Sequence, residues 1–232
     1  MGACDLKLVH VPVFYGNHGL DIHVRTTIRY DYSFIEAAAI KIGDDVLEVG
    51  SFGTYALNGV EDALKANNLV VPTIAGFPIY HTILNEKQHK FDIVFHEHEN
   101  ITISTFKDWV SVTIKDRNKD QFSEVSGFLG SFQGELLARN GTDLHNDINA
   151  FAKDWQIQPD EEMLFRTVRA PQAPQSCILP SADTSEKRRL GEHISTSAAE
   201  EACARFTGSA FKFCVHDVIA SGDLDIALSE TF

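Results

Sequence analysis

Apolar and polar residues alternate along much of the first 130 residues. In Leu20–Ile28, an apolar residue or a threonine recurs at every second position. Because successive side chains of a β-strand point to opposite faces, this period predicts a strand with one buried face. Ala39–Ile42 and Val46–Val49 carry strand patterns on either side of Gly43-Asp44-Asp45, a turn-forming triplet, and they predict a tight hairpin.

The pattern continues toward the middle of the chain. It predicts strands at Phe91–Phe95, Ile101–Phe106 and Trp109–Lys115, with a turn at Lys107-Asp108 between the last two. No long helical pattern interrupts these runs. About nine or ten short strands at this spacing predict a mainly β fold, which we expect to be an antiparallel β-sandwich.

The character of the sequence changes after the strand region. Two prolines within Ala170–Gln175 disfavour both helix and strand, so this stretch predicts a linker. Helical sequence follows at Ser197–Phe206, which opens with a capping-box pattern, and at Ala210–Ser221, which Gly222 ends. We therefore expect a β domain (residues 1–168), a proline-bearing linker (169–190) and a small cysteine-containing helical module (191–232).

Composition narrows the classes of partner. The chain has 232 residues, and 33 Asp and Glu against 20 Lys and Arg give a formal charge of −13. This balance argues against nucleic acid as a partner, because a polyanion is repelled. No apolar run reaches the roughly 18 residues that a membrane-spanning helix needs, so we expect no membrane span in this chain.

Four cysteines bear on the compartment. An even number suits two disulfides in a secreted chain, and it permits three connectivities. Cys203 and Cys214 fall on the two predicted helices, where a bridge would hold a helical pair with little core of its own; the alternative is two buried thiols in a reduced protein. Met1–Asp5 lacks the basic start of a signal peptide, so the chain is either cytosolic or a piece of a longer protein.

Several motifs occur in an order that resembles the von Willebrand factor type D family. Ser126–Phe132, then Asn140-Gly141-Thr142, then Phe151–Trp155 resemble the closing part of that domain, and Gly2–Leu8 resembles its early Gly-x-Cys strand. The resemblance covers residues 2–157. The tail from Phe211 onward is similar to the cysteine-containing module that follows such domains in some surface proteins.

The resemblance implies a non-enzymatic structural or adhesion module, located outside the cell or at the cell surface. Its partners would be other protein modules or the extracellular matrix. Type D domains also occur in yolk lipoproteins, so a lipid-carrier accessory domain is an alternative. The family's opening Gly-Asp-Pro-His strand is absent, which implies that this chain begins one strand late and that its signal peptide is missing. The family's partner for Cys4 falls at Leu129, so Cys4 needs another partner, and by elimination this is Cys177.

The family also implies a calcium loop, but this sequence departs from it. Calcium prefers six to eight oxygen ligands, and the family's paired acids fall here at Leu136-Leu137, which offer none. A substitute site from the nearby acidic loop would use the oxygen-bearing side chains of Asp143, Asp147 and Asn149. The alternative is a solvated acidic loop without metal, and we expect no cofactor.

His96-Glu97-His98-Glu99 follows a predicted strand. Period two would place His96 and His98 on one face, where two imidazoles can bind a transition metal, with His81 or His89 as a third ligand. A metal-dependent hydrolase at this strand end is therefore the alternative function, and a polar turn without metal is the other interpretation. The chain carries no Gly-x-Ser-x-Gly or phosphate-loop motif.

Two sequons, Asn100-Ile101-Thr102 and Asn140-Gly141-Thr142, are candidate glycosylation sites if the protein is secreted. Both fall near predicted loops or strand ends, where a glycan is sterically acceptable.

Overall fold

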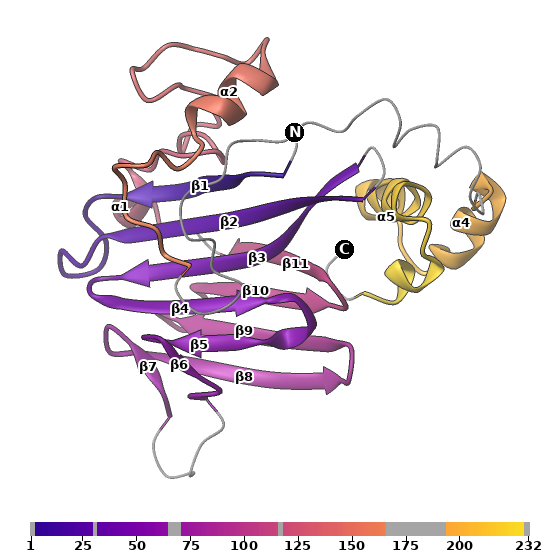
Figure 1. Ribbon diagram of the computed structural model, residues 1–232, viewed down its shortest axis with the longest axis horizontal. Helices are drawn as coiled ribbons and strands as arrows, with labels where there is room; N and C mark the ends of the chain where they lie inside the picture. The colour runs from indigo at the N-terminus through magenta and orange to yellow at the C-terminus, as the bar shows by residue number, and fades with distance from the viewer. Residues whose placement is uncertain (1–2, 30–31, 65–70, 116–117, 166–193, 230–232) are drawn as a thin grey trace.

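The computed structural model describes residues 3–29, 32–64, 71–115, 118–165 and 194–229 of the chain (Figure 1). Two antiparallel sheets face each other, each a simple meander in chain order. The N-terminal sheet has the order β1-β2-β3-β4-β5-β6, with β1 (Asp5–Val11), β2 (Leu20–Arg29), β3 (Tyr32–Ile42), β4 (Asp45–Gly50), β5 (Tyr55–Leu57) and β6 (Val60–Glu61). The second sheet has the order β11-β10-β9-β8-β7, with β7 (Thr73–Ile74), β8 (Phe77–Asn85), β9 (Gln88–Val94), β10 (Asn100–Phe106) and β11 (Trp109–Lys115).

The predicted fold class is confirmed: the chain is mainly β, arranged as an antiparallel sandwich with short helices at its C-terminal end. The predicted hairpin is β3–β4, in which Ile40 pairs with Leu47 and Ile42 with Asp45. The three strands predicted in the middle of the chain correspond to β9, β10 and β11.

The main core lies between the sheets. Ile22, Ile40 and Leu47 from the N-terminal sheet and Phe91 and Ile101 from the second are completely buried and belong to one apolar cluster. Members of this cluster recur at every second position of a strand, as Ile101 and Ile103 do, because every second side chain faces the opposite sheet. Burial of these side chains stabilises the sandwich by about 1.5–3 kcal/mol each.

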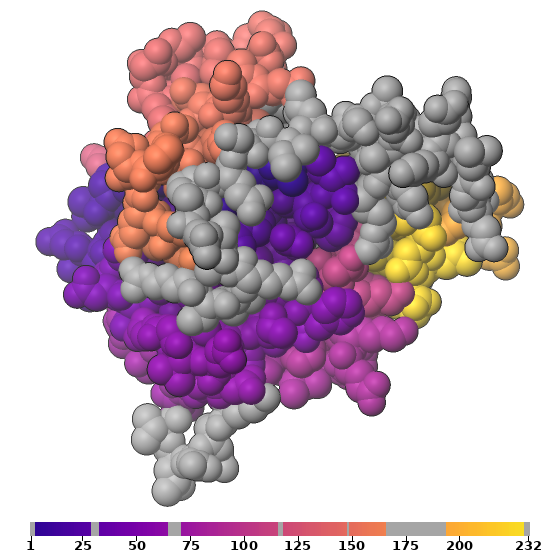
Figure 2. All heavy atoms as spheres, viewed as in Figure 1, coloured from indigo at the N-terminus to yellow at the C-terminus, as the bar shows by residue number. Residues whose placement is uncertain are grey.

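The outer face of the N-terminal sheet is buried as well, which the alternating pattern does not predict. Leu164 and Phe165, which follow the acidic loop, pack on Ala37, Ala39 and Val46. Figure 2 shows the chain that follows the helix α2 (Ile148–Asp154), in orange, lying against this sheet.

Two charged side chains, one from β1 and one from β2, lie in this buried layer. Arg25 forms an ion pair with Asp5 of β1, with Nε 2.7 Å from Oδ1, and its guanidinium lies 4.5 Å from the centre of the Phe165 ring. Both members of the pair are at most 5% exposed. The expectation of a single buried face for the Leu20–Ile28 strand is therefore wrong, because a later segment covers its second face.

The C-terminal helices form a small separate core. α4 (Thr196–Ala202), α5 (Gly208–Ser221) and the short 3-10 helix η2 (Leu224–Leu228) surround Cys203 and Cys214 and pack against Phe106 and Trp109 at one end of the second sheet. The predicted end of α5 at Gly222 is confirmed, where φ is +67°. The capping residue of α4 is Ser195, whose hydroxyl accepts from the Ala198 amide, and not Ser197 as the capping-box pattern predicts.

The remaining short elements are η1 (Ser51–Gly53) and α1 (Lys119–Phe122). The predicted linker, residues 169–190, lies outside the described residues. In the ranges that the structure describes, no helix is long and apolar enough to cross a membrane.

Candidate binding site

The outer edge of β1 is covered by a segment that comes more than 100 residues later in the chain. His10 and Ser126 exchange two main-chain hydrogen bonds of 2.8 and 2.9 Å. The amides of Phe128 and Leu129 donate to the carbonyls of Lys7 and Leu8. The edge is thus closed by paired main-chain groups rather than left open to another chain.

Gly127 is required for this close approach. Its φ is +125°, and a Cβ atom there would lie 2.6 Å from the carbonyl oxygen of Leu8. Only glycine adopts such a conformation at so short a separation without strain.

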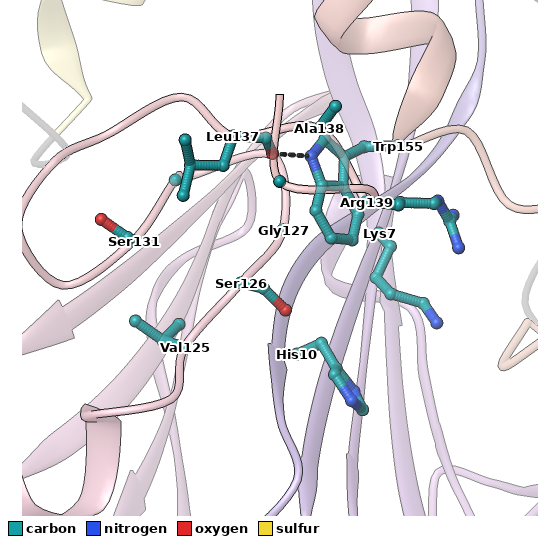
Figure 3. A pocket seen from close by; sticks show the side chains of 12 residues that line it. Lys7, His10, Val125, Ser126, Gly127, Ser131, Leu137, Ala138, Arg139 and Trp155 are labelled. Carbon is teal, nitrogen blue, oxygen red and sulfur yellow. Dashed lines mark hydrogen bonds between the residues drawn. The ribbon is translucent and has the colours of Figure 1, made fainter. Parts of the chain in front are cut away.

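A second segment continues the cover. The Lys7 amide donates to the carbonyl of Trp155, and the Ile157 amide donates to the carbonyl of Asp5, at 2.9 and 3.0 Å. The two covering segments, 126–129 and 155–157, are not in contact along all of β1. Between them lies a cavity of about 380 Å³ (Figure 3).

The described lining of this cavity contains three basic side chains and no acidic one, although the chain as a whole carries a charge of −13. We name it the basic cavity. Its lining residues are Lys7, His10, Val125, Ser126, Gly127, Gly130, Ser131, Leu137, Ala138, Arg139, Gly141 and Trp155.

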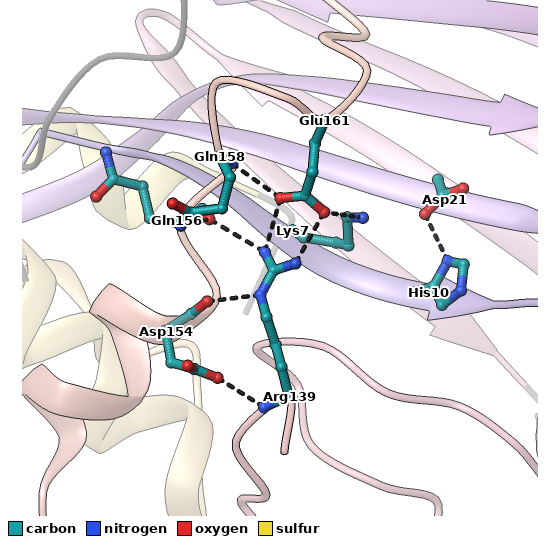
Figure 4. A network of polar contacts seen from close by, with 8 residues as sticks. All are labelled: Lys7, His10, Asp21, Arg139, Asp154, Gln156, Gln158 and Glu161. Carbon is teal, nitrogen blue, oxygen red and sulfur yellow. Dashed lines mark hydrogen bonds and ion pairs between the residues drawn. The ribbon is translucent and has the colours of Figure 1, made fainter. Parts of the chain in front are cut away.

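The acid that partners two of these bases lies outside the lining. Glu161 accepts from Lys7 Nζ at 2.7 Å and from the two terminal nitrogens of Arg139 at 2.8 and 2.9 Å (Figure 4). Burial raises the pKa of Glu161, but the hydrogen bonds from Arg139 and Lys7 lower it more, to about 2. Two cations therefore share one fully ionised carboxylate.

Arg139 also positions the aromatic wall of the cavity. Its guanidinium lies 5.0 Å from the centre of the Trp155 ring, and its Nε donates to the carbonyl of Asp154. The indole N–H of Trp155 donates to the carbonyl of Leu137 at 3.0 Å (Figure 3). These contacts hold the loop that carries Arg139 against the chain that follows α2.

His10 completes the basic lining. Its Nδ1 lies 2.8 Å from Oδ1 of Asp21 on β2. Burial raises the pKa of Asp21, but the hydrogen bond and the charge of His10 lower it below its ordinary value. The imidazole is partly exposed at the mouth of the cavity.

One predicted sequon borders the cavity. Gly141 belongs to the lining, and Asn140 beside it is exposed, with its Oδ1 accepting from the Thr142 amide at 3.0 Å. Asn100 differs: it is the first residue of β10, pairs with Val94 and Lys115, and has a buried side-chain oxygen. The two predicted glycosylation sites therefore differ in accessibility: Asn140 is exposed, whereas the side-chain oxygen of Asn100 is buried.

The candidate calcium ligands serve local roles instead. Asp143 accepts from the amide of His145 and pairs with its ring at 2.8 Å, and Asp147 caps α2 by accepting from the Ala150 amide. Asn149 is exposed on α2. Among the described residues, no three His, Cys, Asp or Glu side chains are placed to hold a metal ion. Leu136 and Leu137 supply no side-chain oxygen, so the residues present do not fit the family's calcium loop.

His96 and His98 do not lie on a strand. β9 ends at Val94, and the Glu99 amide donates to the carbonyl of His96, which closes a turn. Both side chains are exposed, so the prediction that period two places them on one strand face is wrong. His81 and His89, proposed as third ligands, contact each other across β8 and β9 at 3.1 Å.

The disulfide predicted in the helical module is confirmed. Cys203 and Cys214 form a disulfide with a Cα–Cα distance of 5.9 Å, as predicted. Cys4 is buried and disulfide-bonded. Cys177, its predicted partner, lies outside the described residues.

A second cavity, of about 580 Å³, separates α5 from the second sheet. We name it the aromatic groove, because Phe34, Phe106, Trp109 and Phe213 line it, together with serines and the carboxylate of Asp217. Phe34 and Trp109 stack with their ring centres 4.5 Å apart. Neither cavity was predicted from the sequence, since each joins strands, loops and helices that lie far apart in the chain.

Comparison with known proteins adds no further constraint. None of the protein-family models matches the chain, and none of the curated proteins is significantly similar to it. The resemblance to the type D family therefore stays a prediction from the quoted motifs.

Proposed function

We propose that the chain is a non-enzymatic module of an extracellular or cell-surface protein, and that it acts by contact with other proteins or with the matrix. The basic cavity is the proposed contact site. Its ligand would be an oxyanion, either a carboxylate of a protein or a sulfate of a matrix polysaccharide.

The observation that carries this proposal is the charge of the lining: three bases and no acid among its described residues, in a chain with 13 more acids than bases. Oxyanions are the groups that Arg, Lys and protonated His bind best. Lys7 has three N–H donors, and Glu161 takes one of them in the contacts described. The other donors of Lys7, the exposed edge of His10 and the hydroxyl of Ser126 can meet a ligand on the same side.

The disulfides support the location. Bridges persist in oxidising compartments and are rare in cytosolic proteins. Alkylation of protein purified from its native source, with and without reductant, tests this part directly. We expect no reactive thiol before reduction; four thiols reactive without reductant would contradict an extracellular location.

Titration calorimetry with two probes tests the contact site. A heparin-derived hexasaccharide supplies sulfates, and a hexaglutamate peptide supplies carboxylates. We expect one of them to bind, and the double variant Lys7→Gln/His10→Gln to weaken that binding about tenfold. Lys153→Gln is the matched control, since Lys153 is an exposed lysine of α2 that does not line the cavity. The proposal fails if neither probe binds, or if both variants bind alike.

One observation favours a second candidate function, the lipid-carrier accessory domain. The volume and aromatic lining of the aromatic groove are those of sites for apolar ligands. A fluorescent fatty-acid analogue is expected to bind there, and Phe213→Ser to weaken the binding. Equal binding by both forms would remove this candidate. The hydrolase alternative stays a prediction whose two histidines lie in an exposed turn.

A further inference from the structure

The second sheet has an edge that lacks the cover found on β1. β7 pairs with the start of β8 only, through Thr73 with Pro78 and Ile74 with Phe77. The last contact on this side is the Ile79 amide, which donates to the carbonyl of Pro72. Beyond it β8 runs on to Asn85, and no strand of the described chain pairs with that side (Figure 1).

Main-chain groups of this uncovered stretch face outward. In an antiparallel sheet, alternate residues direct both their N–H and their C=O to the same side. Because the Ile79 amide points toward β7, the main chain of Ile83, four residues on, points to the same open side. We name Tyr80–Asn85 the open edge.

Three of the six side chains of the open edge are apolar, and all three are exposed. Tyr80 is 49% exposed, Ile83 61% and Leu84 42%. β8 contains no Asp, Glu, Lys or Arg, although about a quarter of the chain is charged. On the neighbouring strand, Lys90 and Asp92 neutralise each other at 2.9 Å. Proteins usually protect such edges with charge or cover, and an uncovered edge without charged side chains is a site for strand addition.

We propose that the open edge pairs antiparallel with the open edge of a second copy of this chain, around a two-fold axis at Thr82. In this register Tyr80 lies opposite the partner's Leu84, and Thr82 lies opposite the partner's Thr82. The strand is thus complementary to itself, with two Tyr–Leu pairs, two His–Ile pairs and one Thr–Thr pair, and no like charges come together within it. Such cross-strand pairs each contribute about 0.2–1 kcal/mol to sheet stability.

The β-bulge at Leu84, between Ile83 and Asn85, ends the paired stretch. Pairing therefore stops at Leu84, and the contact closes as a dimer of short strands rather than extending further. The net charge of −13 on each copy opposes association, and salt screens this repulsion, so dimerisation is expected to strengthen as ionic strength rises. The dimer contact contains no residue of the basic cavity, so it is independent of the proposed contact site.

Sedimentation velocity over a range of concentrations tests the association. We expect a dimer of the wild type to appear as its concentration is raised to about 1 mM. Ile83→Lys is expected to stay monomeric over the same range. Val60→Lys is the matched control, because Val60 is 60% exposed on β6 of the other sheet and its variant is expected to dimerise as the wild type does. A monomeric wild type, or equal dimerisation of both variants, would overturn the proposal.

Cysteine cross-linking tests the register. Opposite Cβ atoms in an antiparallel pair lie about 4.5–5.5 Å apart, close to the spacing a disulfide spans. Oxidised Thr82→Cys is therefore expected to form a covalent dimer. Tyr80→Cys is more than about 10 Å from its own copy in this register and is expected not to. Efficient cross-linking of Tyr80→Cys with none at Thr82→Cys would overturn the two-fold pairing.

Discussion

Two edges of this sandwich, at β1 and at β8, differ in how far they are covered. β1 is closed by chain that arrives from residues 126–129 and 155–157, and its main-chain groups are paired. β8 is paired on this side only at its start, and the rest of the strand is uncharged and exposes three apolar side chains. The contrast separates two uses of an edge: β1 contributes to folding and carries the basic cavity, whereas the open edge of β8 is left for association.

The comparison predicts large stability costs near β1. Asp5→Ala removes one member of a buried ion pair and takes the Asp5 carboxylate from the Arg25 guanidinium. We expect a loss of about 3–5 kcal/mol in the free energy of unfolding, measured by urea denaturation. Asp225→Ala removes a carboxylate of the helical module that is 42% exposed and forms an ion pair with Lys107, and it is expected to cost less than about 1 kcal/mol. A similar loss of stability in both variants would contradict the distinction between the buried ion pair at β1 and the exposed ion pair of Asp225.

Acid is expected to destabilise the covered layer above β2. Burial lowers the pKa of His23 to about 4, from an ordinary value of 6.5. As the pH falls below 6.5, His23 takes up a proton in the unfolded chain but not in the folded one, and this favours unfolding. The free energy of unfolding is therefore expected to fall by about 3 kcal/mol between pH 6.5 and about pH 4. Melting curves of wild type and His23→Leu over this range check it; an identical pH dependence in the two proteins would contradict the buried neutral imidazole.

Gly127 tests the closure of the edge itself. Gly127→Ala places a Cβ atom 2.6 Å from the Leu8 carbonyl at a positive φ, and we expect a cost of about 2–3 kcal/mol. Gly134→Ala is the control, with a φ of +86° and no atom within 4 Å of the added Cβ, and it should cost about 1 kcal/mol. Equal urea midpoints for the two variants would show that the segment around Gly127 does not pack closely against β1.

The smallest stability effect is expected on the open edge. Ile83→Lys exposes no buried surface, because Ile83 is already 61% exposed, so the free energy of unfolding of the monomer should change by less than about 0.5 kcal/mol. A loss of several kcal/mol in dilute solution would mean that this edge contributes to folding as β1 does.

Local patterns were sufficient for β2, β3, β4, β9, β10 and β11 and for the helical module. The alternation in Leu20–Ile28 and the triplet Gly43-Asp44-Asp45 predict β2 and the β3–β4 hairpin, because both depend on neighbouring residues. The Cys203–Cys214 bridge was predictable for the same reason, since it joins two short helices adjacent in the chain.

Long-range contacts were not predictable in this way. Period two shows that Arg25 and His23 share a face, but not that Leu164 and Phe165 cover the sheet on that side. The basic cavity joins Lys7 to Arg139 and Trp155, and no local motif encodes that meeting. The polar run from His96 to Glu99 was interpreted as the end of a strand, but β9 ends at Val94 and the run forms a turn.

Amide hydrogen exchange, followed residue by residue at several protein concentrations, tests the contrast between the two edges most directly. The amide of His10, bonded to Ser126 within the same chain, is expected to exchange slowly and at a rate that does not depend on concentration. The amide of Ile83 is expected to exchange rapidly in dilute solution and to slow as concentration rises and the partner strand arrives. An Ile83 amide whose exchange rate is the same at every concentration up to about 1 mM would contradict the account.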